Sequence, residues 1–170
     1  MDPKVLILMG SDSDWEVMSE AKKALDDMGV AVECHVSSAH RTPERTGKLA
    51  REAAGRGVQV IVCGAGAAAH LAGVCAAETE LPVLGVPLAA SDLKGLDALL
   101  ATAQMPAGVP VGTLAIGKAG ARNAGLLAAR IVARTDALVA ERVRAQRRQM
   151  AEDVEAKDAA LQAKLAAPKG

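Results

Sequence analysis

Apolar and polar residues follow one another along the chain in segments that predict strands and helices in turn. Val5–Met9 is a continuous aliphatic run, which is typical of a strand buried on both faces. In the segment after it, Ser13 and Glu16 have the spacing of a capping box, an apolar stripe follows, and Gly29 is a helix stop signal. The first strand is therefore expected to lead into a helix capped by Ser13.

The same pattern continues to the end of the compact part of the chain. Residues 30–37 alternate between apolar and polar types, which predicts a half-buried strand near a sheet edge. Thr42 and Pro43 are typical of an N-cap and a first helical turn, so a helix is expected from Pro43 to about Ala54. Further strands are expected at 58–63, 83–86 and 111–116, and further helices at about 70–78, 93–102 and 119–133.

Strands that alternate with helices predict a parallel sheet with right-handed crossovers. Five strands favour the flavodoxin-like doubly wound order, an α/β fold with helices on both faces of the sheet. Ligands in such folds bind at the carboxyl ends of the strands, near the point where the strand order reverses. The chemistry is therefore expected in three segments, which are 10–14, 37–41 and 64–71.

Residues 136–165 lack glycine and are rich in alanine and charged residues, which predicts a long C-terminal helix. Its apolar residues recur in pairs at an eleven-residue interval and form one narrow stripe. We therefore expect a catalytic domain at 1–135 and a helical extension at 136–170 that packs on a neighbouring subunit. The alternative for the extension is a partly frayed, solvated terminus.

Composition and charge exclude several classes of protein. Lysine plus arginine and aspartate plus glutamate each number 20, so a general nucleic-acid-binding surface is not expected. No apolar run approaches the length of a membrane span, and no export signal is visible, so we expect a cytoplasmic protein. The three cysteines form no C-x-x-C pair and are expected to be reduced core thiols.

Ser11, Asp12, Ser13 and Asp14 lie between the first strand and the first helix. Hydroxyl and backbone N–H groups at the positive end of a helix form an anion site. Plain N-capping would account for one of these residues but not for two serines and two aspartates in a row. Because carboxylates repel phosphate, Asp14 is better suited to accept hydrogen bonds from sugar hydroxyls.

The segment Ser38–Pro43 lies at the same predicted edge of the sheet. Arg41 can hold a phosphate with a fork of donors, and Ser38 adds a hydroxyl. His40 is suited to give and take a proton near neutral pH, a role worth roughly 10²- to 10⁴-fold in rate. A lone loop histidine is usually only a surface residue, but the flanking Ser38 and Arg41 favour an acid/base role. His35 lies inside a strand, and we assign it no functional role.

Two glycine motifs resemble nucleotide-binding signatures without satisfying them. Residues 64–69 match G-x-G-x-x-A, but they follow the third strand, and the strand after them carries no acid for a ribose. A bare backbone that approaches a small ligand explains this segment better, and His70 beyond it either enters the pocket or caps locally. Residues 112–118 spell G-x-x-x-x-G-K, but Ala119 replaces the magnesium-binding Ser/Thr. No His, Asp or Cys spacing indicates a metal site.

Taken in order, these segments resemble the PurE family of purine biosynthesis, in particular class I N5-carboxyaminoimidazole ribonucleotide mutase. The resemblance covers about residues 4–131 and rests on Gly10-Ser-Asp-Ser-Asp-Trp15, Ser38-Ala-His-Arg-Thr-Pro43, Gly64-Ala-Gly66, Ala68-Ala-His-Leu71, Pro82-Val-Leu-Gly-Val-Pro87, Gln104-Met-Pro106 and Gly112-Thr-Leu-Ala-Ile-Gly-Lys-Ala-Gly120.

The resemblance implies an isomerase that needs no cofactor and no metal. Its substrate is a small-molecule ribonucleotide, and the reaction moves a carboxylate from the exocyclic nitrogen to a ring carbon by decarboxylation, carbon dioxide trapping and recarboxylation. His40 is implied as the general acid/base, and a homo-octamer with sites at subunit contacts is implied as the assembly. The substrate-binding residues implied by matching position are Ser11, Ser13, Asp14, Ser38, Arg41, Gly66, Ala68, His70 and Leu71.

Three alanines depart from the family pattern and bear on loop shape rather than on activity. Ala67 and Ala107 stand where glycine is usual or common, and Ala72 stands where proline is usual. One alternative function is the class II carboxylase, which uses carbon dioxide directly; Arg41 and His70-Leu71 favour the mutase. The other is a non-catalytic nucleotide-binding module, which would need no proton-transfer residue.

Overall fold

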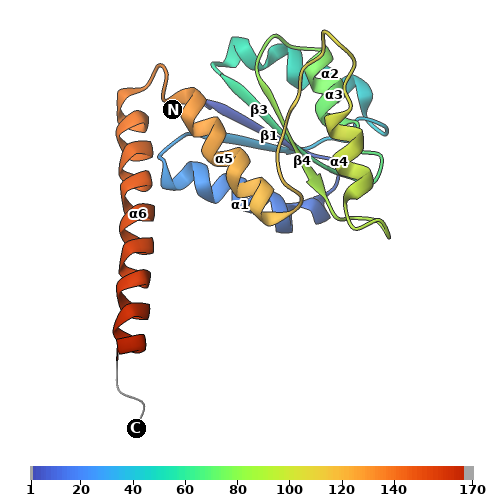
Figure 1. Cartoon of the computed structure of the whole chain (residues 1–170). Coiled ribbons are helices and arrows are strands. Elements are labelled where there is room, and N and C mark those ends of the chain that lie inside the picture. The colour runs from blue at the N-terminus through green and yellow to red at the C-terminus, as the bar shows by residue number, and fades with distance from the viewer. Residues whose placement is uncertain (1, 167–170) are drawn as a thin grey trace.

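The computed structural model describes residues 2–166 and has a five-stranded, all-parallel sheet in the order β2-β1-β3-β4-β5. This order confirms the flavodoxin-like prediction and places β2 at an edge. Figure 1 shows the sheet between two groups of helices. In chain order the elements are β1 (Val5–Met9), η1 (Asp12–Asp14), α1 (Trp15–Asp27), β2 (Val32–Val36), α2 (Pro43–Ala53), η2 (Ala54–Arg56), β3 (Val60–Gly66), α3 (Leu71–Ala77), β4 (Val83–Leu88), α4 (Leu96–Ala103), β5 (Gly112–Thr113), α5 (Lys118–Val132) and α6 (Ala137–Ala166).

The two faces of the sheet are divided by the alternation of side chains along β1. Val5 and Ile7 pack with α1 and α5, whereas Leu6 and Leu8 pack with α2 and α3. All four side chains are fully buried, as the aliphatic run predicted. Cys63 and Cys75 are buried and Cys34 is half-buried, all three as free thiols, which agrees with the expectation for the cysteines.

The core contains no phenylalanine or tyrosine, and small residues let its layers approach closely. A Cβ atom at Gly125 of α5 would lie 2.4 Å from the carbonyl oxygen of Ala21 of α1. A Cβ atom at Gly64 of β3 would lie 2.3 Å from Sδ of Met18. Real Cβ atoms do not reach such distances, so Gly125 is required by packing against the backbone of α1, whereas a side chain at Gly64 would require the buried Met18 side chain to move.

β1 has its predicted bounds, whereas the other four strands differ from the predicted ranges: β2 is shorter at both ends, β4 continues two residues further to Leu88, and the largest differences are in β3 and β5. β3 continues to Gly66, where a loop was expected from Gly64, because Gly66 pairs with Leu88 of β4. β5 spans only two residues instead of 111–116. The carbonyl of Pro87 points to the β5 side of β4, where it accepts a hydrogen bond from Gly117 N. The N–H and C=O of a strand residue point to the same side, and proline has no N–H, so Pro87 offers no donor to β5. The ladder between β4 and β5 cannot continue past this point.

Helix α6 leaves the body of the molecule and projects away from it (Figure 1). Its first turns are attached, because Val139 is buried and Nη1 of Arg142 donates to the carbonyl of Met28 at 3.1 Å. Every residue from 147 to 166 is exposed, while residues 167–170 of the expected extension lie outside the described part of the chain. No helix within residues 2–166 is both long and apolar enough to cross a membrane.

Candidate active site

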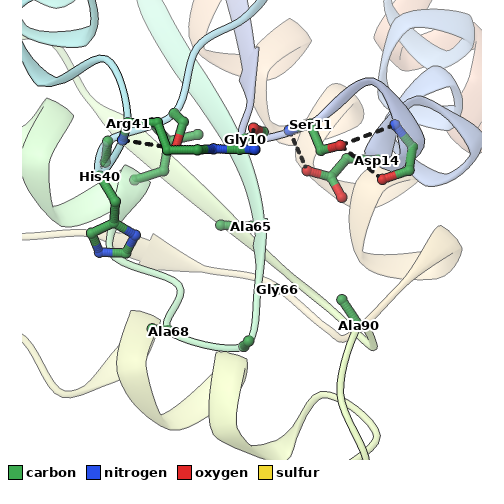
Figure 2. Close-up of a pocket in the computed structure, with 14 residues that line it drawn as sticks. Gly10, Ser11, Asp14, His40, Arg41, Ala65, Gly66, Ala68 and Ala90 are labelled. Carbon is green, nitrogen blue, oxygen red and sulfur yellow. Dashed lines mark hydrogen bonds between the residues drawn. The ribbon is translucent and has the colours of Figure 1, made fainter.

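A cavity of about 470 Å³ lies at the carboxyl ends of the central strands, where the fold predicts ligand binding. Its volume lies in the range of small-molecule sites. Figure 2 shows that the loops after β1, β2 and β3 converge on it. The lining residues are Gly10, Ser11, Ser13, Asp14, Ser38, Ala39, His40, Arg41, Ala65, Gly66, Ala67, Ala68, Leu71 and Ala90.

The loop after β1 is held by a reciprocal cap. Oγ of Ser11 accepts from Ser13 N at 3.4 Å, and Oδ2 of Asp14 accepts from Ser11 N at 3.0 Å. The expected capping box of Ser13 and Glu16 is therefore wrong, because a 3-10 turn precedes α1 and moves the cap two residues towards the N-terminus. Burial raises the pKa of Asp14 above its ordinary value of 3.8, although backbone N–H donors work against this rise.

Hydroxyl groups of the same loop face one another at the start of the first helical segment. Oγ of Ser13 donates to Oγ of Ser11 at 2.9 Å. Both serines line the cavity, so a phosphate there would find two hydroxyls and the positive end of a helical turn. Trp15, the only aromatic residue of the chain other than histidine, opens α1 directly beside Asp14 and is 41% exposed.

Arg41 connects the loop after β2 to the end of β1. Its Nη2 donates to the carbonyl of Gly10 at 2.9 Å, and its Nε donates to Oγ of Ser38 at 3.4 Å (Figure 2). Thr42 is the N-cap residue of α2, as predicted, but its hydroxyl bonds to the backbone of Ser38 at 3.0 Å instead of capping the helix. The loop is thus closed on itself and presents the guanidinium at the cavity wall.

His40 and His70 come together from different loops. Nε2 of His40 lies 2.8 Å from Nδ1 of His70, and the ring centroids are 4.9 Å apart at an interplanar angle of 77°. His40 lines the cavity, whereas His70 is not among the lining residues. His70 is the N-cap residue of α3, and its side chain makes no capping bond. His70 was expected either to enter the pocket or to cap the chain locally, and in the structure it does neither.

The end of β3 forms the floor of the site with little side-chain bulk. A Cβ atom at Gly66 would lie 2.4 Å from Cβ of Ala90, which sequence reasoning did not include in the site. Ala90 follows β4, and the rule that ligands bind beyond strand ends could have indicated it. Ala67 has φ +49°, in the left-handed region where glycine is favoured, so the departure noted at this position carries backbone strain.

All but one of the predicted site residues line this one cavity, His70 being the exception. Of the other two departures from the family pattern, Ala72 is buried in α3 and Ala107 is exposed. Within residues 2–166, no group of three or more His, Cys, Asp or Glu side chains is arranged to hold a metal ion.

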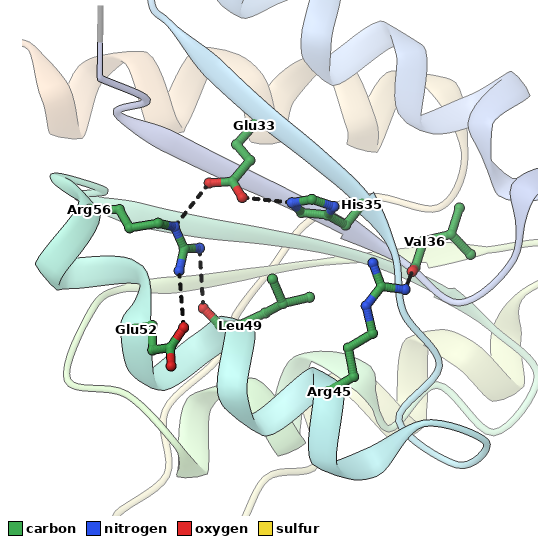
Figure 3. A network of polar contacts seen from close by, with 7 residues as sticks. All are labelled: Glu33, His35, Val36, Arg45, Leu49, Glu52 and Arg56. Carbon is green, nitrogen blue, oxygen red and sulfur yellow. Dashed lines mark hydrogen bonds and ion pairs between the residues drawn. The ribbon is translucent and has the colours of Figure 1, made fainter.

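His35 belongs to a separate polar network on the edge strand (Figure 3). Its Nε2 lies 2.6 Å from Oε1 of Glu33, and Nε of Arg56 donates to Oε2 of the same carboxylate at 3.2 Å. Burial alone would raise the pKa of Glu33, but His35 and Arg56 outweigh it and lower that pKa. Nη1 of Arg45 donates to the carbonyl of Val36 at 2.9 Å, so charged groups protect the open edge of β2.

Comparison with known proteins agrees with the geometry of this site. A family model described as AIR carboxylase matches residues 4–153, which is most of the chain. The chain belongs to the AIR carboxylase family. This membership confirms the resemblance read from the ordered motifs.

Several relatives in the AIR carboxylase family share more than half of their aligned residues with this chain. The N5-carboxyaminoimidazole ribonucleotide mutase of Pseudomonas aeruginosa is 58% identical over 132 residues, covering 78% of this chain and 81% of that protein. The protein of the same name from Mycobacterium tuberculosis strain H37Rv is 52% identical over 160 residues, covering 94% of this chain and 91% of its own length.

A solved structure from the AIR carboxylase family agrees with the fold. Treponema denticola PurE has a TM-score of 0.84 and 26% sequence identity, and the match covers 94% of this chain and 98% of that chain. The strand order, the cavity at the strand ends and this likeness together support the flavodoxin-like assignment.

Proposed function

We propose that the protein is an N5-carboxyaminoimidazole ribonucleotide mutase, with the cavity at the strand ends as its active site. The observation that carries the proposal is that three separate loops bring hydroxyls, a guanidinium and a histidine to one cavity in a chain of this family. The relatives named above as mutases support the same conclusion.

Substrate binding is assigned to the polar wall of the cavity. Ser11, Ser13, Ser38 and Arg41 bind the 5′-phosphate, since their hydroxyls and the guanidinium are gathered there. Asp14 accepts hydrogen bonds from the ribose hydroxyls through the carboxylate oxygens that its backbone contact leaves available. The small residues at the end of β3, including Gly66 and Ala68, let the base lie close to the backbone, with Leu71 beside it.

His40 carries the proton in the proposed reaction. The bond between the exocyclic nitrogen and the carboxylate breaks and releases carbon dioxide, and His40 protonates that nitrogen. The ring carbon then attacks carbon dioxide, and His40 removes the hydrogen of that carbon as the new bond forms. The histidine ends in its starting protonation state, so the reaction needs no external acid or base.

The carbon dioxide must stay in the site between the two steps. In the single chain His40 and Arg41 are exposed, so closure requires the substrate itself or another subunit. We therefore include a homo-octamer with the site at subunit contacts in the proposal, with the exposed part of α6 as a contact between copies. A cytoplasmic location and the absence of a cofactor belong to the same proposal.

Purified protein given N5-carboxyaminoimidazole ribonucleotide is expected to convert it to 4-carboxy-5-aminoimidazole ribonucleotide. The matched measurement supplies aminoimidazole ribonucleotide and carbon dioxide to the same preparation. Efficient carboxylation from carbon dioxide, with poor use of the carboxylated substrate, would favour the class II reaction instead.

The role of His40 is tested by His40→Asn. Because the residue lies on an exposed loop, we expect this variant to fold and to keep most of its substrate affinity while losing turnover by roughly 10²- to 10⁴-fold. Isothermal titration with substrate and a turnover assay measure the two effects. Normal turnover in His40→Asn would leave a nucleotide-binding module as the better explanation.

The role of α6 is tested by ending the chain after Gln146. This cut keeps Val139 in the core and the bond from Arg142 to Met28, and among the described residues it removes only exposed ones. We expect the monomer to stay folded by circular dichroism while the assembly becomes smaller by light scattering. An unchanged solution mass would exclude a docking role for the removed segment.

A further inference from the structure

We propose that His70 is a positioning residue that determines which nitrogen of His40 transfers the proton. Nδ1 of His70 accepts the Nε2–H of His40, which leaves Nδ1 of His40 as the nitrogen that gives and takes the proton. This inference rests on the proposed function, because it concerns the same reacting histidine, but it assigns His70 a role other than contact with substrate.

The geometry of the pair is that of a direct hydrogen bond between two ring nitrogens. The nitrogens are 2.8 Å apart and the ring centroids 4.9 Å apart. The centroid distance exceeds the distance between the nitrogens by about the sum of the two ring radii. Both nitrogens therefore lie close to the line that joins the centroids. Each N–H or lone pair in a ring plane therefore points at the other ring's nitrogen and not at its face.

Only one direction of this bond suits an acid that later acts as a base. A bond between two imidazole nitrogens needs one N–H and one lone pair. If His70 donated, a neutral His40 would carry its proton on Nδ1 and could lose it only by becoming an anion. If His40 donates from Nε2, its Nδ1 can be protonated or free while the bond to His70 stays unchanged. The proposed cycle requires both states, so His40 is assigned as the donor.

The backbone around His70 explains how this residue can hold the His40 ring in place. His70 N donates to the carbonyl of Ala68 at 2.9 Å, and its own carbonyl accepts from Val74 N at 2.9 Å. His70 is thus fixed at the start of α3, whereas His40 lies on the loop before α2. Among the hydrogen bonds of residues 2–166, the one to His70 is the only one that the His40 ring makes.

Two substitutions separate this role from a purely structural one. In His70→Asn, the side-chain oxygen Oδ1 is separated from Cα by the same number of covalent bonds as Nδ1 of histidine. It can therefore accept the same hydrogen bond from His40. In His70→Ala the acceptor is lost. We expect the alanine variant to lose at least about tenfold in kcat with KM within about threefold, and the asparagine variant to stay within about threefold of the parent protein in both.

A second readout does not depend on activity. Long-range ¹⁵N–¹H spectra of the ligand-free protein distinguish histidine tautomers, and the chain has only three histidines to assign. We expect neutral His40 to carry its proton on Nε2 in the parent protein and in His70→Asn, and to be a mixture of tautomers in His70→Ala. His35→Ala, which removes a histidine of the separate polar network, is the control and should leave the His40 signals unchanged.

The outcomes separate the two proposals. Neutral His40 protonated on Nδ1 in the parent protein overturns the inference, as does a loss of kcat in His70→Asn equal to that in His70→Ala, or full activity in both. If the tautomers behave as expected but the parent protein does not act on N5-carboxyaminoimidazole ribonucleotide, the positioning of His40 holds and the proposed function fails.

Discussion

Replacing Ala67 by glycine is expected to stabilise the protein, because Ala67 is held in a backbone conformation that opposes its side chain. Its φ of +49° places it in the left-handed region, which costs an L-residue about 1–2 kcal/mol. The side chain is exposed, so its removal sacrifices little packing. Glycine adds freedom to the unfolded chain, which reduces the gain by about 0.4–1 kcal/mol. The net expectation is a rise of about 1 kcal/mol in the free energy of unfolding.

Gly55→Ala is the matched control, since it isolates the change in the unfolded chain. A Cβ atom at Gly55 meets no atom within 4 Å, and this residue has no positive φ. This control should stabilise the protein by about 0.4–1 kcal/mol. Adding the two changes in the free energy of unfolding cancels the unfolded-chain contribution and gives the strain at Ala67 without reference to any other protein.

Urea unfolding at equal protein concentrations measures all three free energies, and a thermal scan should move upward by roughly 2–4 °C for Ala67→Gly. The decisive observation is whether Ala67→Gly raises or lowers the free energy of unfolding. If Ala67→Gly lowers stability by as much as Gly55→Ala raises it, the backbone at Ala67 carries no strain, and the argument from its conformation is refuted.

Three further predictions follow from close contacts and from charge. Gly66→Ala should raise KM by roughly several-fold, because the new Cβ starts 2.4 Å from Cβ of Ala90 at the cavity floor; an unchanged KM would show that the floor adapts freely. Gly125→Ala should lower the free energy of unfolding by about 1–3 kcal/mol in urea, because its Cβ starts 2.4 Å from the backbone oxygen of Ala21. Since the pKa of Asp14 is raised in the folded state, its stabilising effect is greatest below pH 3.8 and is lost as pH rises through the folded-state value. Asp14→Asn should therefore raise the unfolding midpoint near neutral pH and leave it unchanged in acid, while substrate affinity falls.

The order of elements could be predicted because it depends on local signals. The aliphatic run Val5–Met9 predicted both the bounds and the burial of β1, and Gly29, Pro43 and Gly55 marked the end of α1 and the two ends of α2. The end of β3 was missed because Gly64 and Gly66 look like loop residues, whereas pairing with β4 keeps them in the sheet. Local composition contains no information about that partner strand.

The sequence could predict which segments form the candidate site, but not which residues of those segments contact one another. The topology rule brought the loops after β1, β2 and β3 to one edge. The bond from Arg41 to the carbonyl of Gly10 joins residues 31 apart, and the pair of His40 and His70 joins residues 30 apart. No spacing pattern encodes such contacts, because they depend on how two loops lie against each other after the sheet has formed.

The position of Trp15 gives the protein a built-in optical probe. Phenylalanine and tyrosine are absent, so emission excited near the indole absorption comes from this one side chain alone. The indole is partly exposed and follows directly on Asp14 in the loop that caps the cavity. Since Asp14 lines the cavity, we expect a ribonucleotide that enters the site to change the emission of the neighbouring indole, so that binding to His40→Asn or His70→Ala can be followed by fluorescence without a label and without turnover.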